Sequence, residues 1–276
     1  MKPRALIKPL LVAAAMVAGQ AVAAPSAQQV LTASPIDDIV AHYPAMMKQG
    51  IEDGLARVGQ MPPMVTATIG QVVSHSFRDA DIEQQIVANL ENNLTPDQLA
   101  SVHDWYKTPV ARKIAEAEIA ASAPSVWKEI QAQGPELSKK YRNTERSRMF
   151  ERYDRAARAT ESAVDTTIAV QLGLATAMSA FSPGAMSQQE LRQAIENQRS
   201  TLRGVVGQQV FDSYLYTYED ISTQEMSLYL DFLESAPGAA FSKTVTSSIQ
   251  QAISEPIESV SSQMVRLLAP AAGGKQ

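Results

Sequence analysis

Apolar residues recur every three or four positions along almost the whole chain. This spacing is typical of a helix that buries one face. The alternating apolar and polar pattern of strands is scarce. The sequence therefore predicts an all-α fold, with helical segments at 36–55, 82–90, 163–181 and 191–218 in addition to the two described next.

One helical unit occurs twice. The sequence LTPDQLASVHDWYKTPVARKI begins at Leu94, and ISTQEMSLYLDFLESAPGAAF begins at Ile221, 127 residues later. Thr95 and Ser222 stand where an N-cap hydroxyl is expected, and a Gln or Glu three residues later can close a capping box. Pro96 also suits the first position of a helix. We expect each copy to begin a helix at the same place.

The two copies share an apolar stripe and a stop. Thr108-Pro109 disfavours helix before the proline and can cap a new helix after it. Ser235-Ala236-Pro237-Gly238 has the same properties. Outright identity is low, so the duplication is predicted from pattern. The stripe residues are Leu99, Val102, His103 and Tyr106 in the first copy, and Met226, Tyr229, Leu230 and Leu233 in the second.

Asp104 and Asp231 are an identical pair at equivalent positions, and each precedes a hydroxyl residue by four positions. We expect each carboxylate to accept a hydrogen bond from that hydroxyl, on Thr108 or Ser235, or from the adjacent turn. The alternative, a catalytic acid pair, would require two separate repeats to bring the carboxylates together.

The N-terminus predicts export. Lys2, Arg4 and Lys8 flank an apolar stretch, and Ala21-Val22-Ala23 is a small-x-small cleavage site. These are the parts of a secretory signal peptide, so we expect cleavage near Ala23 and a periplasmic or secreted protein. No other segment is predicted to span a membrane, because Asp165 and Gln171 interrupt the most apolar helix.

The expected organisation follows from these patterns. The sequence predicts two related helical-bundle halves in tandem after the signal peptide. The segment between them is basic, and is interpreted either as a solvated helix or linker with i,i+4 ion pairs or as a docking site for an acidic partner or headgroup. The predicted parts are 1–23 (signal peptide), 24–138 (first half, motif 94–114), 139–158 (basic linker or helix), 159–268 (second half, motif 221–241) and 269–276 (flexible tail).

Composition narrows the chemistry. The chain has no cysteine, which excludes disulfides, thiolate ligands and cysteine nucleophiles. Cleavage after residue 23 leaves 21 basic against 29 acidic residues, a net charge of −8 that disfavours non-specific binding to nucleic acid. His42, His75 and His103 lie in separate elements, so no metal site is expected. His103 is interpreted as a half-buried core histidine, with a proton-handling role as the alternative.

The first copy resembles a known family. Leu94 to Leu99, followed by Trp105-Tyr106-Lys107-Thr108-Pro109, is similar to the signature of the bacterial exported family called domain of unknown function 2059. Ala111 stands where that signature has glycine. The second copy keeps Phe232, Ser235 and Gly238, with Leu233 for tyrosine and Ala236 for proline. The resemblance implies a small periplasmic or secreted helical bundle without established catalytic residues.

Three functions remain open at this point. We expect a non-enzymatic cell-envelope protein that binds another envelope protein, a peptide or a lipid-like ligand, with no cofactor. The alternatives are a structural or stress-related factor without a ligand groove, and an envelope hydrolase. A polar cleft with converging carboxylate, hydroxyl or His103 groups would favour the hydrolase, and an apolar groove would favour binding. The sequence sets no oligomeric state.

Overall fold

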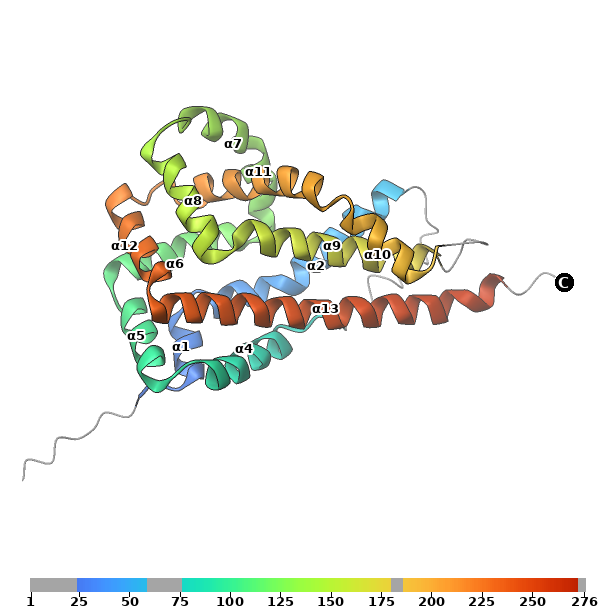
Figure 1. Ribbon diagram of the computed structural model, residues 1–276, viewed down its shortest axis with the longest axis horizontal. Coiled ribbons are helices and arrows are strands. Elements are labelled where there is room, and N and C mark those ends of the chain that lie inside the picture. The colour runs from blue at the N-terminus through green and yellow to red at the C-terminus, as the bar shows by residue number, and fades with distance from the viewer. Residues whose placement is uncertain (1–23, 59–75, 180–185, 273–276) are drawn as a thin grey trace, which may run out of the picture.

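The computed structural model describes residues 24–58, 76–179 and 186–272, and in these ranges the secondary structure is helical throughout, with no strand (Figure 1). The predicted all-α fold is therefore confirmed. The predicted signal peptide, His75 and the last residues of the predicted tail lie outside the described residues.

The helices follow one another with short connections. Those of the first half are α1 (Ala27–Ala33), α2 (Ile36–Val58), α4 (Asp79–Asn93), α5 (Pro96–Tyr106), α6 (Pro109–Ser122) and, after a 3-10 turn (Pro124–Val126), α7 (Trp127–Lys140). Those that follow are α8 (Glu145–Ala157), α9 (Ala159–Ser179), α10 (Gln188–Glu196), α11 (Arg199–Thr217), α12 (Thr223–Glu234) and α13 (Ala236–Ala272).

Both motif copies begin with the predicted capping box. The Thr95 hydroxyl accepts the Gln98 N–H at 3.3 Å, and the Gln98 side chain accepts the Thr95 N–H at 2.9 Å. Ser222 and Glu225 repeat the arrangement at 3.2 and 2.8 Å. Each box satisfies donors that a helix start otherwise leaves free. The local sequence alone thus specifies where α5 and α12 begin.

The turn inside each motif is also built alike. The Thr108 hydroxyl accepts the Ala111 N–H, and the Ser235 hydroxyl accepts the Gly238 N–H, both at 3.2 Å. The second turn is tighter, because a Cβ added to Gly238 would lie 1.9 Å from the Phe232 carbonyl oxygen. The glycine is thus required in the second copy, while the first copy has room for the methyl group of Ala111.

Helices from the two halves pack on each other. α4 lies against α13, and α11 lies against α7; likewise α5 lies against α13, and α12 against α6. In Figure 1, α5 and α12 lie at the same end of the molecule and α13 runs along its length. One hydrophobic core therefore contains residues of both halves, among them Leu31, Ile86, Val102, Leu215, Leu230 and Phe241.

The basic segment is part of this body. It contains α8, which packs against α9, α11, α12 and α13. Arg146 on α8 is 8% exposed, and its guanidinium donates to the carbonyls of Tyr218 and Ile221. Arg152 pairs with Glu234 at 2.6 Å. These two arginines were expected to pair along their own helix or to face solvent; instead they bind groups of the second half, some 70 to 80 residues further on.

We predict that Gly238→Ala destabilises the protein by about 1–3 kcal/mol, because the added methyl group collides with the backbone at Phe232. Gly204→Ala is the matched control: a Cβ there meets nothing within 4 Å, and the glycine lies inside α11. That change should stabilise by about 0.5–1 kcal/mol. Urea unfolding of both variants measures the difference, and equal stabilities would contradict the assignment.

Candidate functional site

The two motif copies meet through their aromatic residues. Trp105 stacks on Phe232 with ring centroids 4.7 Å apart and planes within 9°. These are equivalent positions of the two copies. Tyr106 contacts both Phe232 and Phe241 edge-on, at 6.0 and 5.9 Å. The aromatic positions of the family signature therefore join one copy to the other, in arrangements that aromatic rings favour.

A carboxyl group lies beside this aromatic contact. Glu118 on α6 accepts hydrogen bonds from the Tyr218 and Tyr229 hydroxyls at 2.6 and 2.7 Å. Burial raises the pKa of Glu118, and the two hydroxyl donors offset part of that rise. Burial and the nearby carboxyl raise the pKa of both tyrosines well above 10, so they stay protonated donors at neutral pH. The cluster fixes α6 to α12.

The surface above this cluster carries an ion pair between the same helices. Lys113 of α6 lies 2.9 Å from Glu225 of α12. Together with the capping bonds from Ser222, the lysine lowers the pKa of Glu225 to about 2. The carboxylate that closes the second capping box is thus also a contact between the halves.

The motif residues proposed from sequence serve the backbone or the packing. Pro96 and Pro109 occupy the first positions of α5 and α6, and Pro237 lies in the first turn of α13. Asp104 lies 3.1 Å from Lys107, and Asp231 lies 3.1 Å from Arg152, with both carboxylates well exposed.

The expected hydrogen bond from hydroxyl to aspartate is not the one seen in the second copy. There the Ser235 hydroxyl donates to the Phe232 carbonyl at 2.6 Å, because that carbonyl at the end of α12 lacks a helical partner and lies closer. His103 is half-buried, as expected, and His42 Nδ1 lies 2.8 Å from the Ser122 hydroxyl. Across the described ranges, no group of three His, Asp or Glu residues is arranged to hold a metal ion.

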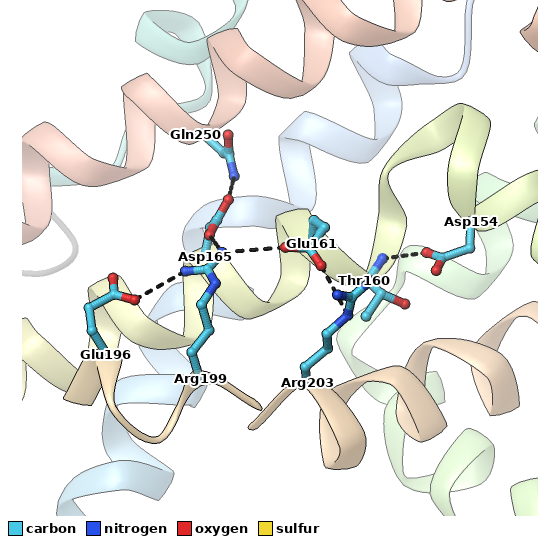
Figure 2. A network of polar contacts seen from close by, with 8 residues as sticks. All are labelled: Asp154, Thr160, Glu161, Asp165, Glu196, Arg199, Arg203 and Gln250. Carbon is cyan, nitrogen blue, oxygen red and sulfur yellow. Dashed lines mark hydrogen bonds and ion pairs between the residues drawn. The ribbon is translucent and has the colours of Figure 1, made fainter. Parts of the chain in front are cut away.

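A second polar cluster lies between α9, α11 and α13 (Figure 2). Arg199 pairs with Asp165 and reaches Glu161 and Glu196, each at 3.4 Å. The Gln250 side chain donates to the other oxygen of Asp165 at 3.0 Å. Both oxygens of the carboxylate that interrupts the apolar α9 sequence are therefore engaged.

Beside Asp165, a polar pocket opens between the start of α9 and α13. It encloses about 240 Å³, including space open to solvent. Arg158 and Lys243 lie on it, both exposed, and neither forms an ion pair with any described residue. Arg158 has φ 53°, in the left-handed region, and links α8 to α9. The full lining is Arg158, Ser162, Asp165, Lys243, Thr246, Ser247 and Gln250.

Sequence reasoning did not find this pocket or Glu118. Glu118 follows the buried Ile114 by four positions, so a charged residue on the apolar stripe of α6 was the available signal. For the pocket the signal was Asp165 inside an apolar run. Its other lining residues come from two helices about 80 positions apart, and no local pattern joins them.

Comparison with known proteins agrees with the resemblance noted above. Residues 80–140 match a family described as "Uncharacterized protein conserved in bacteria (DUF2059)". The match covers the first motif and confirms the resemblance there, whereas the second motif lies outside it. No curated protein and no solved structure matches the chain. Among the helices of the described residues, none is long and apolar enough to cross a membrane.

We predict that Glu118→Gln changes how stability depends on pH. The folded-state pKa of Glu118 is raised above 4.5, so its contribution to stability is fully present below that pH and is lost as the pH rises through the folded pKa. Glutamine keeps the acceptor oxygen without the charge. The melting temperature of the variant should therefore gain on that of the parent between about pH 4 and pH 8. Glu116→Gln, on the exposed face, is the control, and parallel curves for Glu118→Gln and the parent would contradict the assignment.

Proposed function

We propose that the protein is exported to the cell envelope and acts there by binding a ligand, without chemistry of its own. Its partner is an envelope protein, a peptide or a lipid-like molecule. The sequence pattern at 1–23 and the bacterial family matched at 80–140 support the location. The absence of cysteine is compatible with either redox compartment, so it carries no weight here.

The observation that carries the binding role is the composition of the α9–α13 pocket. Its cations and hydroxyls are hydrogen-bond donors, and its carboxylate, Asp165, is already held by Arg199 and Gln250. General acid–base catalysis needs a group free to take a proton from the substrate. Donors without such a base suit the recognition of an anion. The motif residues supply no competing site, because they cap helices and pack the core.

We further propose that 24–138 and 159–268 are tandem copies that pair about a pseudo-twofold axis. The reciprocal contacts support this, since α4 on α13 corresponds to α11 on α7, and α5 on α13 corresponds to α12 on α6. The stacking of the equivalent residues Trp105 and Phe232 places them close to such an axis. On this proposal the ligand pocket lies in the second copy.

Export gives a direct expectation. Expressed with its leader in a Gram-negative host, the protein should be recovered from the periplasmic fraction with Ala24 as its first residue. Intact-mass measurement reports the cleavage. Ala21→Leu with Ala23→Leu, which removes the small residues of the site, should leave the precursor uncleaved. Mature protein confined to the cytoplasm would contradict the proposed location.

Binding is tested on protein purified from the periplasm. Native mass spectrometry of the parent should show a co-purified ligand, lost in Arg158→Gln/Lys243→Gln. Lys128→Gln/Arg192→Gln makes the same charge change at two exposed positions outside the pocket, and should retain the ligand. Parent protein that carries no ligand would contradict the binding role and favour a structural factor.

A further inference from the structure

We infer that the pocket between α9 and α13 recognises a phosphate group. This inference rests on the proposed binding function and names the chemistry of the ligand. It follows from three properties of the pocket: the number of its donors, the balance of charge around it, and its absence from the equivalent place in the first half.

The donor set fits phosphate better than carboxylate. Arg158 and Lys243 provide two positive charges, and Ser162, Thr246 and Ser247 provide three hydroxyls. A phosphate monoester carries about −1.5 to −2 charges at neutral pH and has three strong acceptor oxygens. A carboxylate carries a single charge on two oxygens. The two cations match the phosphate charge, and the arginine fork suits two of its oxygens.

The acidic groups nearby are already compensated. Asp165 is paired with Arg199, and Glu161 lies 3.1 Å from Arg203 in addition to its contact with Arg199. Asp154, on α8, accepts the Thr160 N–H at 2.6 Å (Figure 2). The positive end of the dipole of α9, which begins at Ala159, adds to the field of the two cations. An anion entering the pocket therefore meets a locally positive site on an acidic protein.

The first half provides an internal comparison. The position 127 residues before Arg158 is Leu31, which is buried in the core, and the position before Lys243 is Glu116. The hydroxyls and the amide are replaced in the same way, and only the aspartate is kept. The helical framework forms without this polar set, so its presence in the second half points to a ligand. The seven equivalent residues are Leu31, Pro35, Asp38, Glu116, Ile119, Ala120 and Ala123.

The first test is a calorimetric titration of the mature protein with inorganic phosphate at low millimolar salt. We expect saturable binding at one site, weakened at least about tenfold in Arg158→Gln/Lys243→Gln, because both compensating charges are lost. Thr246→Val/Ser247→Ala should weaken it several-fold with no change of charge. Lys128→Gln/Arg192→Gln should stay within about twofold of the parent, since surface charge away from the site is screened. Circular dichroism verifies that each variant is folded.

The second test separates the sources of the group. Flotation with vesicles of phosphatidic acid in phosphatidylcholine presents a phosphate monoester on a lipid. Binding that is lost in Arg158→Gln/Lys243→Gln but not in the surface control assigns the group to a lipid headgroup. Phosphate binding without flotation assigns it to a soluble phosphate compound. Either result supports the inference.

Two results would overturn it: no saturable phosphate binding by the parent, or equal losses in the pocket variant and the surface control. If a ligand co-purifies while phosphate does not bind, the phosphate assignment is wrong and the binding function stands. If phosphate binds but no ligand co-purifies, the pocket chemistry is supported and the function in the envelope is contradicted.

Discussion

The contact between Trp105 and Phe232 is the interaction on which the rest of the fold depends. It brings the ends of α5 and α12 together, and the hydroxyls of Tyr218 and Tyr229 reach Glu118 next to it. Large aromatic side chains bury more apolar area than any others, and stacked pairs add about 0.5–1.5 kcal/mol beyond that area. A chain without cysteine has no covalent cross-link between its halves. This aromatic junction, with the core around it, takes that place.

What the sequence could predict was local. Thr95 and Ser222 cap their helices as expected, because a capping box involves residues three positions apart. The buried stripe residues Val102 and Leu230 followed from helical spacing for the same reason. By contrast, the buried role of Arg146 depends on two carbonyls more than 70 residues away. Its sequence neighbours gave only the impression of a basic, solvated helix.

The candidate site shows the same limit. The pocket combines Ser162 of α9 with Ser247 of α13, and each is an ordinary serine in its own helix. The acidic balance of the chain even argued against an anion ligand, because net charge describes the average field and not the field at one place. Only the tertiary structure shows that Arg199 neutralises Asp165 and leaves Arg158 and Lys243 to act together.

The exchange of helices between the halves has a consequence for the ancestry and integrity of the chain. A single half would leave the faces of α4 and α5 uncovered, because α13 of the other half covers them. Two separate copies could satisfy both sets of faces only as a homodimer with the same exchange. Joining them in one chain replaces a concentration-dependent association with an intramolecular one, at a high effective concentration. Cutting the chain between α7 and α8 would therefore give two fragments that each need the other in order to fold.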